Sequence, residues 1–92
     1  MQYLQKIENR DRQLRKDAKR IGMKVKIKAM DSLYYGYTLY KGDTVMLGGE
    51  PVENSAGLVE CENFVRAYAQ MIGAMSDDGR WLVDANGEPL EV

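Results

Sequence analysis

A change of hydrophobic period at Gly22 constrains the fold of this chain more than any other feature of its sequence. Before it, apolar residues recur at helical spacing from Leu4 to Ile21, which predicts an amphipathic helix over residues 3–21. After it, residues 24–29 (Lys-Val-Lys-Ile-Lys-Ala) alternate strictly, which predicts a strand with one buried face. Glycine adopts the left-handed conformation without steric cost, so Gly22 is expected to cap the helix.

Two further strands are predicted between this strand and the Gly48-Gly49-Glu50-Pro51 break. Residues 33–40 are rich in tyrosine, threonine and leucine, which favour a strand. Residues 41–43 (Lys-Gly-Asp) are typical of a short hairpin connection, so residues 44–47 are expected to return as a third strand. Short loops of this kind predict antiparallel neighbours.

Apolar residues at helical spacing predict a second helix over residues 58–76, capped by Asn54 or Ser55. We expect its apolar face to lie in the core, packed against the strands. The residues expected to be buried there are Phe64, Tyr68 and Ile72, together with Val25 and Ile27 of the first strand.

Residues 81–84 and 90–92 flank Asn86-Gly87, a strong hairpin signal, although Pro89 indicates an edge or irregular strand. The predicted order is therefore α-β-β-β-α-β-β in one domain covering residues 1–92. We expect an α+β two-layer sandwich, with both helices on one face of an antiparallel sheet.

Charge is divided unequally along the chain. Residues 1–28 contain ten Lys or Arg and three acids, a net charge of +7, whereas residues 29–92 contain three basic residues and eleven acids, a net charge of −8. The overall charge of −1 therefore hides a basic head and an acidic body. Such asymmetry predicts a polyanionic partner, either nucleic acid or a membrane surface.

The candidate binding surface combines the polar face of the first helix with the outward side of the first strand. Lysines two apart on a strand stand roughly 6.6 Å from each other, a spacing compatible with consecutive phosphates. A solvated helix face, and lysines that keep a strand from aggregating, are the alternatives. The candidate residues are Arg12, Arg15, Lys16, Lys19, Arg20, Lys24, Lys26 and Lys28.

Four of the six tyrosines lie within residues 34–40. Alternation places Tyr35 and Tyr37 on one face of the strand and Tyr34 and Tyr40 on the other. Such a row could stack bases, anchor a protein interface or pack against neighbouring strands. The sequence leaves these three roles open.

Catalytic groups are scarce. The chain has no histidine, and its single cysteine, Cys61, falls within the apolar stripe of the second helix without a base partner. We therefore expect no enzyme activity, no cofactor and no metal site. One cysteine also excludes an internal disulfide, and the first twenty residues contain no apolar signal segment, so we expect a cytoplasmic monomer that does not enter membranes.

The predicted order of the first five elements, α-β-β-β-α, resembles the double-stranded RNA-binding domain. That resemblance implies phosphate-binding lysines at the start of the second helix. This chain has Glu60 and Glu62 there. Its basic residues belong instead to the first helix and first strand, so no residues of that family carry over.

In length, single α+β domain and segregated charge, the whole chain also resembles phage-encoded anti-CRISPR proteins that act on type I surveillance complexes. The resemblance implies binding to Cas subunits and guide RNA, with target DNA recognition blocked. A basic head could contact the RNA backbone while the acidic body contacts a positively charged channel. Two alternatives remain: an autonomous RNA- or DNA-binding regulator, and an adaptor whose basic helix meets an acidic protein.

Overall fold

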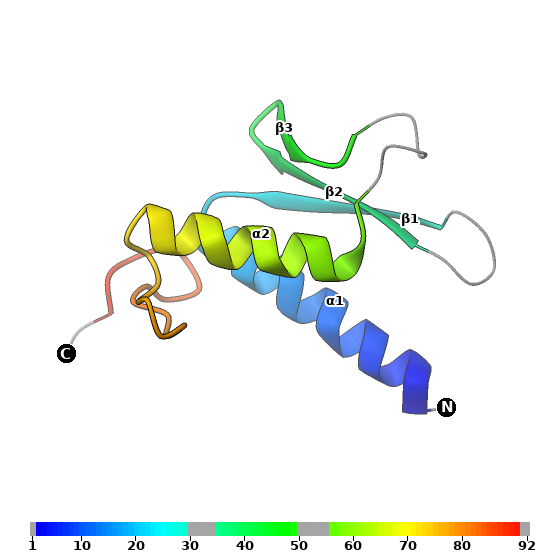
Figure 1. Ribbon diagram of the computed structural model, residues 1–92, viewed down its shortest axis with the longest axis horizontal. Coiled ribbons are helices and arrows are strands. Elements are labelled where there is room, and N and C mark those ends of the chain that lie inside the picture. Colours follow the sequence, from blue (N-terminus) through cyan, green and yellow to red (C-terminus); the bar gives the residue numbers. More distant parts are fainter. Residues whose placement is uncertain (1, 30–34, 50–55, 91–92) are drawn as a thin grey trace.

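In the residues that the structure describes, the fold is built from two helices and three strands in the order α-β-β-β-α (Figure 1). The computed structural model describes residues 2–29, 35–49 and 56–90, with side chains from residue 9 onward except Ala29. The elements are α1 (Gln2–Arg20), β1 (Lys24–Ala29), β2 (Tyr35–Lys41), β3 (Thr44–Leu47) and α2 (Leu58–Met71). The strands form one antiparallel sheet ordered β1-β2-β3, which confirms the predicted α+β class.

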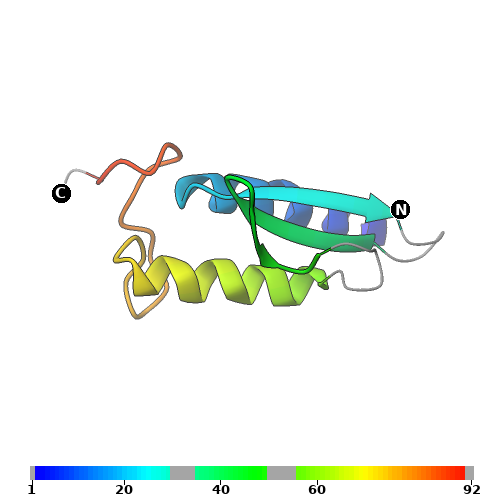
Figure 2. The same cartoon turned by 90° about the horizontal axis from the view of Figure 1, so that it is seen from above.

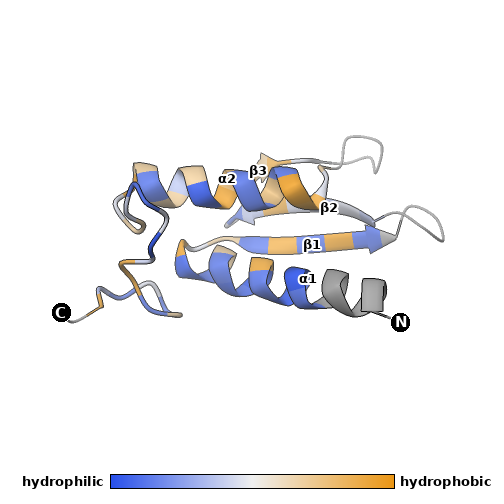
Figure 3. Ribbon diagram, turned by 60° about the horizontal axis from the view of Figure 1, so that its bottom comes forward, coloured by the Kyte–Doolittle hydropathy of each residue, from blue (hydrophilic) through white to orange (hydrophobic). Residues whose placement is uncertain are grey.

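Strict alternation along β1 gives the sheet one apolar and one basic face, and Figure 3 shows β1 banded by hydropathy. Val25 lies opposite Leu39 of β2, and both are buried. Lys24 lies opposite Tyr40 on the other face. The β2–β3 connection passes through the predicted turn at residues 41–43, whereas the expected start of β2 at residues 33 and 34 lies outside the described residues.

Both helices pack on the apolar face, as predicted, with α1 against β1 and α2 against β2. Figure 2 shows α1 behind β1 and α2 beside β2, and the two helices also contact each other. Ala18 of α1 and Ala69 of α2 are fully buried. The core consists of Leu14, Ala18, Ile21, Met23, Val25, Tyr37, Leu39, Ala56, Cys61, Val65, Ala69, Ala74 and Met75.

The two helices end in the same way, and Gly22 caps α1 as predicted. Gly22 has a φ of 77°, and the next residue, Met23, donates its N–H to the Ala18 carbonyl at 2.9 Å. Gly73 has a φ of 80° and follows α2, which therefore ends at Met71 rather than at residue 76. In both cases the residue after the glycine is buried, so the chain turns back into the core.

The start and the buried face of α2 differ from the prediction. The helix begins at Leu58 after Gly57; the expected caps, Asn54 and Ser55, lie outside the described residues. Its buried line is formed by Cys61, Val65 and Ala69. These residues lie four apart, so they form one line along the helix.

The three residues predicted to be the buried face of α2 lie outside that line. Phe64 and Tyr68 flank it and are half-buried, with their rings stacked 6.1 Å apart. Ile72 is 49% exposed because the helix has ended and the chain is turning there. The prediction was therefore wrong for Ile72, whereas Phe64 and Tyr68 pack against the core, as Ile27 of β1 does, but are only half-buried.

The two strands predicted after α2 do not form within residues 72–90. Instead, single bridges join Met75 to Trp81 and Val83 to Pro89. The chain does reverse at the predicted turn, where Asp84 accepts bonds from the N–H groups of Asn86 and Glu88. Two backbone hydrogen bonds flank the second bridge, from the Asp84 N–H to the Glu88 carbonyl at 2.8 Å and from the Leu90 N–H to the Leu82 carbonyl at 3.0 Å. Pro89 lies between them, at a position whose N–H an antiparallel pair does not use.

Candidate functional site

Arg15 of α1 reaches across to the edge of β1. Its Nη1 donates a hydrogen bond of 3.0 Å to the carbonyl oxygen of Val25. The Val25 side chain points into the core while its carbonyl group points away from β2, because an edge strand leaves alternate backbone groups unpaired by the sheet. The bond fixes a guanidinium at the junction of helix and strand.

Two adjoining hollows lie at this junction, of about 340 Å³ and about 610 Å³. Both are lined by Arg15, Lys24 and Val25. We call them together the α1–β1 groove. The remaining lining residues are Lys19 and Met23 in the first hollow, and Lys26, Ile27, Tyr40 and Gly42 in the second.

The groove gathers four cations, one pair from each element: Arg15 and Lys19 from α1, and Lys24 and Lys26 from β1. Among the described residues, no carboxylate lines either hollow. Walls of one charge sign concentrate the field inside a concave surface and attract ions of the other sign. The groove is therefore suited to a polyanion.

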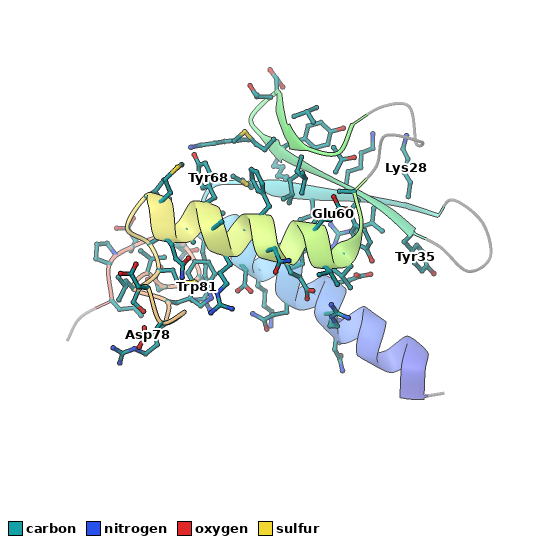
Figure 4. The ribbon with its side chains drawn as sticks, viewed as in Figure 1. Lys28, Tyr35, Glu60, Tyr68, Asp78 and Trp81 are labelled. Atoms are coloured by element: carbon teal, nitrogen blue, oxygen red, sulfur yellow. The ribbon has the colours of Figure 1, made fainter. Side chains whose placement is uncertain are left out.

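Three other predicted site residues lie near the groove without lining it. Arg12 and Lys16 are exposed on α1. Lys28 shares the outward face of β1 with Lys24 and Lys26 but is half-buried at the far end of the strand (Figure 4).

Arg20 has a structural role, and the expectation that it lies on the exposed face was wrong. Its guanidinium donates to the Val83 carbonyl at 3.0 Å and lies 5.0 Å from the ring centre of Trp81. Its Nε is 3.6 Å from Asp17 and buried. Gly87 completes the contact, because a side chain there would lie 2.7 Å from the Arg20 carbonyl oxygen. Arg20 thus attaches the C-terminal segment to the end of α1.

A second α1 cation, Arg10, joins the two helices. Its Nε donates to Glu62 at 3.2 Å, and its Nη2 forms an ion pair with the same carboxylate. Nearby, Glu60 accepts a weak bond of 3.4 Å from the Gly57 N–H at the start of α2. Carboxylates therefore occupy the helix end where a double-stranded RNA-binding domain would hold phosphate, and we place no phosphate site there.

Asp11, which interrupts the apolar stripe of α1, accepts a hydrogen bond of 2.7 Å from the buried Tyr37 hydroxyl. Burial and this bond raise the pKa of Tyr37 well above its usual value of 10. The carboxylate thus satisfies a buried phenol. Tyr37 serves packing, one of the three roles that the sequence left open for the tyrosines.

The surroundings of Cys61, the single cysteine, keep its thiol protonated. Cys61 is fully buried, and this burial, with nearby Glu60 and Glu62, raises the pKa of its thiol to about 11. The thiolate is therefore scarce at neutral pH. In the described part of the chain, no three His, Cys, Asp or Glu side chains are grouped to hold a metal ion. Within the same residues, neither helix is long and apolar enough to cross a membrane.

A third hollow, of about 230 Å³, lies between α1, α2 and the C-terminal segment. Its floor is apolar and includes Leu14 and Val65, while Asp17, Glu62 and Arg66 bring both signs of charge to its lining. Mixed charge selects no class of ion, so this hollow is the weaker candidate.

Tyr40 is a groove residue that the sequence did not assign to the site. It is half-buried and lies opposite Lys24 in the β1–β2 register. The signal was present, because the tyrosine row and the lysine row were both recognised. What was missing was the register, which decides which tyrosine stands beside which lysine.

Comparison of the chain with protein-family models, with curated proteins and with solved structures gave no match.

Proposed function

We propose that this protein binds the phosphate backbone of a nucleic acid in the α1–β1 groove. The observation that carries the proposal is the bond from Arg15 to the Val25 carbonyl, which holds a guanidinium beside the lysines of β1. A guanidinium fixed before binding loses less side-chain freedom when it meets phosphate. Since backbone contacts carry no sequence information, we expect little base preference from these four cations.

We further propose that the nucleic acid is the guide RNA of a type I CRISPR surveillance complex, whose target DNA recognition this protein blocks. Support comes from the resemblance to phage anti-CRISPR proteins and from the separation of charge. Carboxylates of α2 and the C-terminal segment, such as Glu60, Asp77 and Asp78, lie outside the groove. They suit the positively charged channels in which such complexes hold nucleic acid.

The element order favours a second candidate, an autonomous RNA-binding regulator, because α-β-β-β-α is also the order of the double-stranded RNA-binding domain. Glu60 and Glu62 at the start of α2 argue against that domain's mode of binding. An adaptor for an acidic protein remains the third candidate.

The test of backbone binding compares two lysines of the same helix. Lys19→Gln removes a groove cation, and Lys16→Gln removes an exposed lysine outside the groove. We measure the affinity for RNA by fluorescence anisotropy over a range of salt concentrations. Lys19→Gln should reduce the salt slope by about 0.7–0.9, the value for one lost phosphate contact, and Lys16→Gln should leave it unchanged. Equal effects of the two variants would disprove a role for the groove.

The partner is tested with a purified type I surveillance complex and its guide RNA alone. An inhibitor that needs a surface of protein and RNA together should bind the complex far more tightly, because its carboxylates repel free RNA. An autonomous RNA-binding protein should bind both equally. Binding to neither would refute the guide-RNA assignment, and binding that ignores nucleic acid entirely would favour the adaptor.

A further inference from the structure

We infer that the α1–β1 groove takes single-stranded nucleic acid, with one unpaired base stacked on Tyr40. The inference rests on the proposed function and specifies its ligand. The larger hollow is lined by Tyr40 together with Arg15, Lys24 and Lys26. An aromatic ring beside cations is the combination that proteins use to hold a strand whose bases are exposed.

The fold places this ring on the face of the sheet that neither helix covers. Its neighbour Leu39 is fully buried beneath the helices, and side chains alternate along a strand, so Tyr40 points to the opposite side. The pairing of β2 with β3 shifts register here, with Leu39 opposite Leu47 and Tyr40 opposite Val45. The extra residue, Met46, lies in β3, so the alternation along β2 is kept and Tyr40 stays on the side opposite to Leu39. Tyr40 keeps part of its surface exposed to solvent, and that surface is what a base needs for stacking.

The dimensions favour a nucleotide over a bare phosphate. The larger hollow measures about 610 Å³, inside the range of roughly 300–1,000 Å³ typical of small-molecule sites. The smaller hollow continues from it past Lys19, and the two share Arg15 and Lys24. The larger can hold a base, and the continuous row of cations can follow the phosphates on either side.

A duplex cannot use this arrangement, because its bases are stacked on one another and paired inside the helix. It can offer phosphates to the four cations but no free face to Tyr40. The groove should therefore prefer a single strand over a duplex of equal length, with little preference among bases, since every base presents a π-face.

The experiment uses the whole protein with a short fluorescein-labelled oligouridylate, either alone or annealed to oligoadenylate. Tyr40→Leu should weaken binding of the single strand by about tenfold and leave the salt slope unchanged, because a stack and no ionic contact is lost. Duplex binding should stay as it was, and Tyr40→Trp should restore single-strand binding. The matched control is Tyr35→Leu, since Tyr35 is a 47% exposed tyrosine of the same strand outside the groove.

A second measurement needs no substitution. Irradiation of the wild-type protein bound to an oligonucleotide containing 4-thiouridine should produce a crosslink at Tyr40. Crosslinks confined to other positions would overturn the inference, as would equal affinity for duplex and single strand. If Lys19→Gln lowers the salt slope while Tyr40→Leu has no effect, backbone binding stands and base stacking fails. If the wild-type protein binds neither nucleic acid, both fail together.

Discussion

The two flanks of α1 both carry basic residues, but those on one flank line the groove and those on the other stabilise the fold. On the flank facing the edge of β1, Arg15 and Lys19 line the groove. On the flank facing α2 and the C-terminal segment, Arg10 pairs with Glu62, and Arg20 holds Trp81 and Val83. We call these the groove flank and the structural flank.

The difference shows that counting cations along a helix overestimates a binding surface. An arginine with a carboxylate, a carbonyl and an aromatic ring around it stabilises the fold, and its charge is already neutralised in part. Lysines that stand beside one another repel, so their proximity does not stabilise the fold. Cations that line a hollow to which no described carboxylate contributes, as in the α1–β1 groove, are therefore the ones to test for a binding partner.

The largest expected effect is a difference in the free energy of unfolding between variants of two adjacent residues, Arg20 and Lys19. Arg20→Ala removes a hydrogen bond from a charged donor and a cation–π contact, so unfolding in urea should show a loss of about 2–4 kcal/mol. Lys19→Ala should change stability by less than about 0.5 kcal/mol. If both variants lost the same stability, the distinction between the two flanks would fail.

On the buried side of α1, the hydrogen bond between Asp11 and Tyr37 can be tested by substitution. Tyr37→Phe leaves the Asp11 carboxylate without its partner and should cost about 1–3 kcal/mol. Tyr40→Phe, in the groove, should cost much less. Chemical denaturation at neutral pH compares the two variants, and equal losses would contradict the assigned role of Tyr37.

The same pair predicts an alkaline limit to stability. The pKa of Tyr37 is raised in the folded protein, chiefly by burial, so the folded state keeps this proton when the unfolded chain loses it near pH 10. Tyr37 therefore stabilises the fold fully below pH 10, and its contribution falls by about 1.4 kcal/mol per pH unit above that value. Tyr37→Phe should remove this part of the decline, measured as the difference between the two denaturation curves from pH 9 to 11.5. If stability fell equally with pH in the wild-type protein and in Tyr37→Phe, the contribution assigned to Tyr37 would be refuted.

Arg15 lies at the boundary between the two roles and should show both. Arg15→Ala removes the bond to Val25, so we expect a loss of about 0.5–1.5 kcal/mol in stability together with a lower salt slope of RNA binding. Lys24→Ala should lower the salt slope with little change in stability. Denaturation and salt-dependent anisotropy on the same preparations distinguish them. An Arg15 variant with unchanged stability would show that the bond to Val25 does not fix the side chain.

The smallest effect belongs to Arg10. Its pair with Glu62 is solvent-exposed, with side-chain exposures of 46% and 34%, and such pairs contribute about 0.2–1 kcal/mol. Arg10→Ala should cost no more than this, and the difference should shrink in high salt because ions screen exposed charges. A double-mutant cycle with Glu62→Ala isolates the coupling energy of the pair. A coupling energy that does not change with salt would contradict the assignment of Arg10 and Glu62 as an exposed ion pair.

Local signals predicted the elements well where the pattern was strict. Alternation fixed β1 over Lys24–Ala29, and Gly22 fixed the end of α1. The same local logic failed after α2, because a strand exists only when a second strand completes its ladder. Asn86-Gly87 made the predicted turn, but up to residue 90 the segments on its two sides are joined by the single Val83–Pro89 bridge and form no strands.

Periodicity likewise predicted the correct side of α2 without showing which of its residues are fully buried. Cys61 was predicted within the apolar stripe and is buried, but Phe64 and Tyr68 are only half-buried, and Ala69, which the stripe did not include, is fully buried. A helical stripe is wide, and the distance between the packed layers decides which of its residues lie at the centre. That distance depends on the sheet and on α1, which the pattern of one helix does not contain.

By itself the sequence determined the α+β class, the positions of most elements and the concentration of positive charge in residues 1–28, because period, glycine placement and composition are properties of short stretches. Only the tertiary structure decided what each charge does. It turned Arg20 toward Trp81, joined Asp11 to Tyr37 across 26 positions of sequence, and set Tyr40 opposite Lys24. These pairings depend on strand register and on the rotation of α1 about its axis. Both are set by the packing of the whole core rather than by neighbours in sequence.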